Sequence, residues 1–209
     1  MKILVLGATG ALGREVVAQA LKRGHDVTVF VRDPRRLTTP TDRLRVLVGD
    51  VLDDGDALTA AVHGQDVVIS ALGIGKALKP AGLIAGSVPR ILRAMERESV
   101  RRLVFTSAFG VGETYHDAPF IPRIIFRTLL RRMYADKAAG EVELRRSPLD
   151  WTIVYPTRMT DGPATGQYRD GERLTLRGSL TISRADAADF LLAEAEDSAY
   201  VRTVVLISY

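Results

Sequence analysis

Three glycines near the N-terminus, Gly7, Gly10 and Gly13, stand three residues apart between an apolar run and a helical pattern. In a strand–turn–helix setting, the first glycine permits the tight turn, the second lets the backbone approach a pyrophosphate, and the third lets the helix pack closely on the strand. The helix N-terminus adds free N–H groups and a partial positive charge. We therefore predict that Gly7, Thr9, Gly10, Ala11, Leu12 and Gly13 bind a dinucleotide; the alternative is a tight turn without a ligand.

Arginines follow the second apolar run at Arg32, Arg35 and Arg36. An NAD site usually presents an acid to the ribose 2′-hydroxyl at this point, whereas an NADP site presents arginine to the 2′-phosphate. The arginines therefore favour NADP(H), and NAD(H) is less favoured. Asp33 keeps NAD(H) open, because a shift of one residue at the strand end would point the acid inward. A merely solvated turn is the alternative without a ligand.

The elements that must position these residues alternate between strands and helices. Expected strands are Lys2 to Leu6, Asp26 to Val31, Leu44 to Val48, Asp66 to Ser70, Arg101 to Thr106, Trp151 to Tyr155 and Thr203 to Ile207. Expected helices are Gly13 to Arg23, Asp53 to His63 and Val88 to Ser99. This rhythm predicts one α/β domain over residues 1–209, of the Rossmann type, with a doubly wound, mostly parallel sheet of about seven strands.

A long basic stretch, residues 119–146, departs from this rhythm. We expect an amphipathic helix or helix pair whose arginines are solvated while Ile124, Ile125, Leu129 and Met133 pack inward. Because residues 110–119 form a polar loop directly after a strand, residues 110–147 are alternatively a substrate segment, a lid or a dimer face.

Composition narrows the class of protein. Hydrophobic residues make up 46% and charged residues 26%, which predicts a packed globular chain. The chain has no cysteine, and its three histidines lack ligand spacing, so we expect no metal. The apolar run at Ile3 to Leu6 is too short for a signal peptide or a membrane span, which predicts a cytoplasmic protein. A net charge of +4 fits an NADP site, so a nucleic-acid partner is not expected; a monomer and a homodimer both stay open.

The glycine spacing resembles that of the short-chain dehydrogenase/reductase superfamily. Nearly the whole chain resembles its atypical NAD(P)H-binding, NmrA-like members, and most closely the flavin reductase and biliverdin-IX-beta reductase group. The segments that carry the resemblance are Gly7 to Gly10, Val31 to Asp33, Gly49 to Leu52, Gly64 to Asp66, Ala71 to Gly73, Thr106 to Phe109 and Ile182 to Asp189.

The resemblance implies further cofactor contacts. Asp50 and Val51 would border the adenine, and Ala71, Leu72 and Gly73 would pass beneath the adenosine and the pyrophosphate. Thr106 and Ser107 would lie near the nicotinamide, which Pro156 and Thr157 would cover from the other side. Each has a structural alternative: Asp50 as a turn residue, Ser107 as a strand-end cap and Pro156 as a strand stop.

The candidate catalytic residues depart from the superfamily's pattern. Its usual Tyr-x-x-x-Lys pair appears here as Tyr134 and Lys137, one residue closer, which on a helix rotates the lysine by about 100° and draws it back by about 1.5 Å. By resemblance to atypical members, Lys137 would contact the nicotinamide ribose. Flavin reductases of this type can carry a histidine where this chain has Arg158, and an arginine there would favour an anionic substrate group.

Three functions follow from these residues. The leading one is an NADPH-dependent reductase that transfers hydride to a small, planar, conjugated acceptor of the flavin, quinone or tetrapyrrole type, which needs little acid catalysis. The second is a regulatory protein that senses NAD(P) without turnover, which the altered Tyr134 and Lys137 spacing and the basic surface favour. The third is a carbonyl reductase or isomerase of a biosynthetic pathway that uses Tyr134 or Ser107.

Overall fold

The computed structural model describes residues 1–37, 42–73, 82–115, 128, 130–175 and 180–209. Its strands are β1 (Lys2–Leu6), β2 (Asp26–Val31), β3 (Leu44–Val48), β4 (Val67–Ser70), β5 (Arg102–Thr106), β6 (Asp150–Pro156), β7 (Arg158–Thr160), β8 (Arg169–Gly171), β9 (Thr181–Ser183) and β10 (Thr203–Ser208). Its α-helices are α1 (Ala11–Lys22), α2 (Gly55–Val62), α3 (Leu83–Arg97), α5 (Arg131–Arg146) and α6 (Arg184–Asp197), with short 3₁₀ helices η1 (Pro34–Arg36) and η2 (Gly112–Tyr115).

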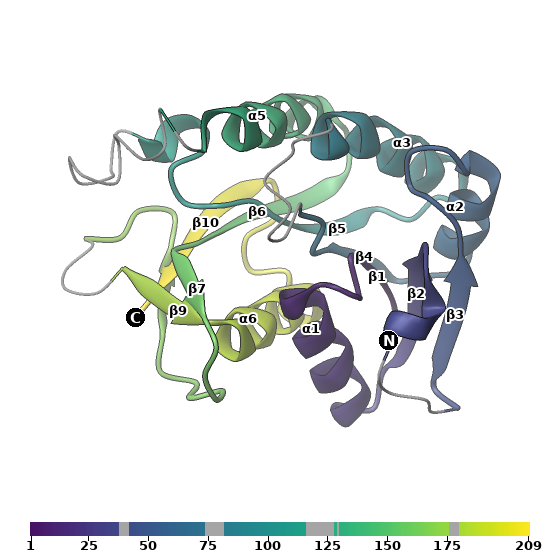
Figure 1. The fold of residues 1–209 in the computed structure, drawn as a ribbon, viewed down its shortest axis with the longest axis horizontal. Coiled ribbons are helices and arrows are strands. Elements are labelled where there is room, and N and C mark those ends of the chain that lie inside the picture. Colours follow the sequence, from purple (N-terminus) through teal and green to yellow (C-terminus); the bar gives the residue numbers. More distant parts are fainter. Residues whose placement is uncertain (38–41, 74–81, 116–127, 129, 176–179) are drawn as a thin grey trace.

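The main sheet has eight strands in the order β3-β2-β1-β4-β5-β6-β10-β8 among the described residues. All neighbours are parallel except β8, which runs antiparallel to β10 at one edge. Helices α2, α3 and α5 cover one face, and α1 and α6 cover the other (Figure 1). The chain is therefore a doubly wound, Rossmann-type α/β domain, as the alternating pattern predicts.

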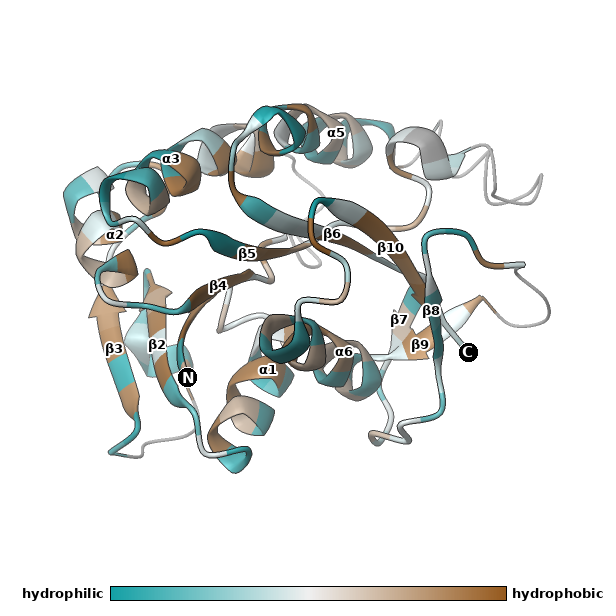
Figure 2. Ribbon diagram, turned by 180° about the vertical axis from the view of Figure 1, so that it is seen from behind, coloured by the Kyte–Doolittle hydropathy of each residue, from teal (hydrophilic) through white to brown (hydrophobic). Residues whose placement is uncertain are grey.

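The central strands are apolar on both faces because helices cover both. In β1, Leu4 and Leu6 face the α2/α3/α5 side, while Ile3 and Val5 face α1 and α6. All four are essentially fully buried. Figure 2 shows the same continuous hydrophobic character along β4 and β10. Such runs are typical of parallel strands.

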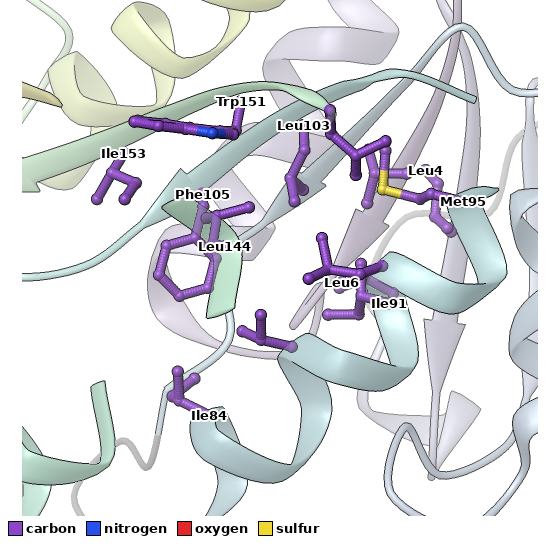
Figure 3. Close-up of a cluster of buried hydrophobic side chains, with 14 of the residues drawn as sticks. Leu4, Leu6, Ile84, Ile91, Met95, Leu103, Phe105, Leu144, Trp151 and Ile153 are labelled. Carbon is purple, nitrogen blue, oxygen red and sulfur yellow. The ribbon is translucent and has the colours of Figure 1, made fainter. Parts of the chain in front are cut away.

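The larger of the two cores lies between the sheet and helices α3 and α5. It contains side chains from both helices and from β1, β5 and β6, namely Leu4, Leu6, Ile84, Ile91, Met95, Leu103, Phe105, Leu144, Trp151 and Ile153 (Figure 3). This core holds α3 and α5 against the carboxyl half of the sheet, where the candidate site lies.

All seven predicted strands are present, with ends within one residue of those expected. The edge strand β8 and the separate β7–β9 pair were not expected from the sequence. Helix α6 was also not predicted, because its apolar residues are buried around most of its circumference and form no single stripe. Helix α3 begins at Leu83, before the predicted Val88, although Pro89 lies inside it.

Helix α5 corrects the expectation for residues 119–146. Arg131 and Arg132 are exposed as predicted, and Met133 is only partly buried. Ile124, Ile125 and Leu129 lie outside the described residues. The buried residues of α5 are Asp136, Lys137, Gly140, Glu141 and Leu144, so its inward face is largely charged. None of the helices among the described residues combines the length and apolar character needed to cross a membrane.

The glycine turn yields the first prediction. A Cβ added to Gly13 would lie 2.2 Å from the carbonyl oxygen of Gly7, a backbone atom that cannot move without breaking the turn. We expect Gly13→Ala to lower the free energy of unfolding by about 1–3 kcal/mol and to abolish dinucleotide binding. Urea unfolding and cofactor titration measure both effects.

The matched control is Gly55→Ala at the start of α2, where an added Cβ meets nothing within 4 Å. Because alanine is the better helix former, this variant should be neutral or slightly stabilising. Equal behaviour of the two variants would show that close packing at Gly13 is unimportant.

Candidate functional site

A pocket of about 460 Å³ lies at the carboxyl ends of β1 to β4. This is the edge where open α/β sheets bind ligands, next to the point where the strand order reverses. The residues that line it are Leu6, Gly7, Thr9, Gly10, Phe30, Val31, Arg32, Arg36, Gly49, Asp50, Val51, Leu52, Ala71, Leu72, Gly73 and Leu83. Most of the predicted cofactor residues are therefore brought together in one place.

The glycine turn forms the floor of this pocket. Gly7 adopts a positive φ of 81°, and its ideal Cβ would lie 2.5 Å from the carbonyl oxygen of Ala71, so only glycine fits between the turn and the end of β4. The Gly10 N–H donates to the Gly7 carbonyl at 2.9 Å, and Gly10 is the N-cap of α1. Leu12 and Gly13 are buried behind the turn, so they can serve a ligand only through their backbone.

The first turn of α1 supplies the positive end of the site. Its N–H groups, those of Ala11, Leu12 and Gly13, have no intrahelical acceptor, as in every helix. The helix dipole adds partial positive charge at the same point. A pyrophosphate placed over Gly10 would receive both contributions, which fits the predicted dinucleotide.

The three arginines after β2 separate in the structure. Arg32 and Arg36 line the pocket, whereas Arg35 does not. Arg35 donates to both carboxylate oxygens of Asp33, at 2.8 and 3.1 Å. This side-chain hydrogen bonding lowers the pKa of Asp33 and occupies the acid that an NAD site would need. We predicted that all three arginines contact the cofactor, but Arg35 pairs with Asp33 and does not line the pocket.

The adenine end of the pocket is built by the segment after β3. Asp50 accepts a hydrogen bond from the Leu52 N–H at 2.9 Å, and Arg32 Nη1 lies 3.7 Å from the other Asp50 oxygen. Gly49 has to be glycine because an added Cβ would lie 2.5 Å from the Phe30 ring. Phe30 and Leu83 also line the pocket, although sequence reasoning missed them; their apolar character gave no signal beyond that of core residues.

Helix α5 contacts the backbone of β5 at the end of that strand. Lys137 is buried and donates from Nζ to the Thr106 carbonyl at 3.3 Å. Burial lowers the pKa of Lys137 to about 8, against the opposing effect of Glu141 and Asp136. The Thr106 hydroxyl oxygen is buried and has no hydrogen-bond partner in the described structure. It is therefore an orphaned polar group beside the predicted nicotinamide site.

A buried carboxylate lies one helical turn after Lys137 and was not found from the sequence. The Ser107 hydroxyl donates to Glu141 Oε1, and the Tyr155 hydroxyl donates to Glu141 Oε2 at 2.5 Å. Burial raises the pKa of Glu141 despite these two hydrogen bonds. The sequence does hold one indication of Glu141: it stands four residues after Lys137, a spacing that places both side chains on one face of a helix.

Tyr134 and Lys137 do not act on a shared atom. The Tyr134 hydroxyl donates to the Phe109 carbonyl at 3.0 Å, while Lys137 contacts Thr106. Burial raises the pKa of Tyr134 to about 12. Tyr134 and Lys137 therefore have separate partners. Among the described contacts of Tyr134, none lowers the pKa of its hydroxyl.

The segment after β6 lies outside the pocket at β1 to β4. Thr157 is buried, and its hydroxyl donates to Ser208 Oγ at 3.1 Å, a partner on β10. Pro156 ends β6, and Arg158 begins β7 with an exposed side chain. None of these three lines the pocket at β1 to β4. Arg158 is thus available to a substrate only from solvent.

The fold and this pocket are those of a Rossmann-type dinucleotide-binding domain. The family model described as NAD(P)H-binding matches residues 7–198, nearly the whole chain. The chain belongs to this NAD(P)H-binding family. The match spans both the glycine turn and the α5 residues, so it covers all of the candidate site.

Individual proteins agree with this assignment. The uncharacterized protein YwnB of Bacillus subtilis is 27% identical over 207 residues, which cover 94% of this chain and 92% of YwnB. ChuY, an anaerobillin reductase from Escherichia coli O157:H7, superposes with a TM-score of 0.83 at 21% identity, over 100% of this chain and 97% of ChuY. A short-chain dehydrogenase/reductase from Veillonella parvula in complex with NADP has a TM-score of 0.85 at 19% identity, over 100% and 94%. At these identities the two structures show the shared fold.

The buried lysine yields the second prediction. Lys137 releases its proton near pH 8 in the folded chain, but only near its ordinary pKa of 10.5 in the unfolded chain. Between these values the unfolded chain binds more protons, so the free energy of unfolding should rise with pH, by up to about 3 kcal/mol from this residue. Urea unfolding at pH 7.5, 8.5 and 9.5 should show that Lys137→Met loses this rise.

Lys22→Met, at an exposed position in the last turn of α1, is the control and should keep the wild-type slope. A Lys137→Met slope identical to that of the wild type would contradict the depressed pKa.

Proposed function

We propose that this protein is an NADPH-dependent reductase that transfers hydride to a planar conjugated acceptor of the flavin, quinone or tetrapyrrole type. The observation that carries the proposal is the engagement of Tyr134 with the Phe109 carbonyl, which leaves the site without an activated tyrosine. Acceptors of this type delocalise the charge that hydride brings, so their proton need not come from a tyrosine of lowered pKa. The structural likeness to an anaerobillin reductase supports the same class of acceptor.

The protein's own contribution is to hold and orient the reactants. The nicotinamide, when bound, supplies the hydride. The turn at Gly7 to Gly10 and the N-terminus of α1 would hold the pyrophosphate, and Asp50 would accept from the adenine amino group. Lys137 and the orphaned Thr106 hydroxyl would fix the ribose and carboxamide end. Such positioning makes hydride transfer effectively unimolecular.

The arginines favour NADPH over NADH. Arg32 and Arg36 face the pocket where β2 ends, and a 2′-phosphate there would accept charge-assisted hydrogen bonds from both. The acid at the end of β2, Asp33, already accepts from Arg35 and does not line the pocket. Discrimination between NADPH and NADH would therefore rest on the guanidinium groups of Arg32 and Arg36 and on the pairing of Asp33 with another arginine.

Substitution of these arginines is the third prediction. We expect Arg32→Ala and Arg36→Ala each to weaken NADPH binding by about tenfold or more while NADH binding stays unchanged, because the lost hydrogen bonds involve only the 2′-phosphate. Arg45→Ala, at an exposed position on β3 that does not line the pocket, is the matched control and should leave NADPH affinity unchanged. Fluorescence titration with both dinucleotides gives the affinities. Equal weakening for NADH and NADPH would contradict a 2′-phosphate site.

Arg158 supports a preference among acceptors. Its exposed guanidinium stands directly after Thr157, at the carboxyl end of β6, where it can meet a phosphate or carboxylate on the substrate. Acceptors with such groups include FMN and the tetrapyrroles. An Arg158→Ala variant that binds anionic acceptors as well as the wild type does would remove this role.

The fourth prediction concerns activity itself. NADPH oxidation, followed by the loss of the near-ultraviolet absorbance of the reduced nicotinamide, should be stimulated by at least one acceptor among FMN, FAD, riboflavin, quinones and tetrapyrroles. Tyr134→Phe should retain most of this activity, because the hydroxyl contacts Phe109 rather than a reacting group. Inactivity on the whole panel would refute the reductase.

Two other outcomes would identify the alternatives. Tight NADP binding without turnover, together with a protein partner, would indicate a nucleotide-sensing regulator. Strong loss of activity on carbonyl substrates in Tyr134→Phe would indicate a carbonyl reductase, since only that chemistry needs a tyrosine acid.

A further inference from the structure

The carboxylate of Glu141 is enclosed by several elements of the fold. Its own helix α5 provides one wall, Ser107 after β5 and Tyr155 on β6 contact its two oxygens, and an ideal Cβ on Gly112 would lie 3.6 Å from Oε2. The residue is 3% exposed. Burial of an ionisable group at this level is costly unless it is paired or can become neutral, so its presence requires an explanation.

Packing alone does not explain this arrangement. Leu144, one turn further along the same face of α5, is fully buried in the apolar core, so an apolar side chain is accommodated there. Glu141 instead forms two charge-assisted hydrogen bonds to hydroxyl groups, and one of these hydroxyls belongs to Ser107 at the carboxyl end of β5. The Ser107 hydroxyl thus lies between the buried Glu141 carboxylate and the proposed nicotinamide end of the site.

We propose that Glu141 is a positioning residue that stores a proton and exchanges it with the bound acceptor through the Ser107 hydroxyl. This inference rests on the proposed reductase function. It assigns to α5 a proton route that does not pass through Tyr134.

The hydrogen-bond geometry supports two states of this pair. With Glu141 ionised, Ser107 and Tyr155 both donate to it. With Glu141 protonated, its O–H donates to Ser107, and the Ser107 hydrogen turns toward the site. Burial, which raises the pKa of Glu141, brings the second state closer to neutral pH.

The proposed step balances as follows. The acceptor gains one hydride from NADPH and one proton from the Ser107 hydroxyl. Ser107 regains its proton from the carboxylic acid of Glu141, which becomes a carboxylate. After the product leaves, a proton from water returns to Glu141 through Ser107. The net reaction consumes NADPH, the acceptor and one proton.

The charged and titratable neighbours of Glu141 define the pH window of the test. Lys137 and Arg145 lie on its own helix, with Arg145 Nη2 3.9 Å from Oε2, and Tyr155 faces it from β6. Lys137 keeps its proton well below pH 8, and burial raises the pKa of Tyr155. Glu141, whose pKa is also raised by burial, is therefore the group of this cluster whose titration the test follows at pH values below 8.

The test combines turnover with a binding measurement and is the fifth prediction. Glu141→Gln and Ser107→Ala should each lower kcat by about a hundredfold or more, with NADPH affinity nearly unchanged. The double variant should be no slower than Ser107→Ala, because both residues act on one proton. In the wild type, kcat should fall as pH rises through the pKa of Glu141, and Glu141→Gln should lack this fall.

Glu143→Gln is the matched control. It makes the same change on the same helix, but Glu143 is half-exposed and pairs only with Arg146, at 3.5 Å, among the described contacts. It should match the wild type in kcat and pH profile. Additive losses in the double variant, or an unchanged pH profile in Glu141→Gln, would overturn the proposal. If Glu141→Gln fails to fold, Ser107→Ala alone should still remove the pH-dependent fall.

A calorimetric proton count separates this proposal from the reductase function. The positive charge of an oxidised nicotinamide bound near Ser107 would favour ionised Glu141, so NADP⁺ should release more protons on binding than NADPH at pH values below 8, where Lys137 stays protonated. Titration in two buffers of different ionisation enthalpy measures the difference, which Glu141→Gln should abolish and Glu143→Gln should keep. An inactive wild type with this difference refutes only the reductase; an active one without it refutes only the role of Glu141.

Discussion

The burial of three charged side chains on the inward face of α5 is the constraint on which the arrangement of the site depends. Asp136 accepts from the N–H groups of Ile84 and Ala85, both at 3.0 Å, and so caps the N-terminus of α3. Lys137 donates to the Thr106 carbonyl, and Glu141 accepts from Ser107. Because a buried charge without a partner is strongly destabilising, each contact fixes one neighbour of α5. Helix α3 and the end of β5 therefore take their positions from one helix.

The same arrangement connects the two halves of the site. Helix α3 contributes Leu83 to the dinucleotide pocket, and its first turn is held by Asp136. Lys137 and Glu141 contact Thr106 and Ser107 at the end of β5, where we propose that the nicotinamide binds. Gly140, between them, lets α5 approach α3 closely, because an added Cβ would lie 2.7 Å from the Ile84 side chain. Helix α5 thus contacts the elements that carry both ends of the candidate site.

The charged residues after β2, at the other end of the site, differ from those of α5. There the charges are exposed, so individual pairs contribute little to stability. What matters is which of these side chains line the pocket. Asp33 pairs with Arg35 and does not line it, whereas Arg32 and Arg36 do. We propose different tasks for the two groups of charges: proton handling for the buried side chains of α5, and discrimination between NADPH and NADH for the exposed arginines after β2.

Local patterns in the sequence determined the class of fold, the seven central strands and the dinucleotide turn. Periodicity and glycine spacing are local properties, so Gly7, Gly10 and Gly13 could be interpreted without knowledge of distant residues. Tertiary structure decided which of the arginines line the pocket and which partners Tyr134 and Lys137 contact. It also brought Glu141 into contact with Ser107. It also decided helix α6, whose burial on most sides hides the stripe that identifies a helix. The reason is physical: a side chain's partner depends on the packing of elements far apart in the chain, and a charged residue on a helix looks solvated until a neighbouring strand buries it.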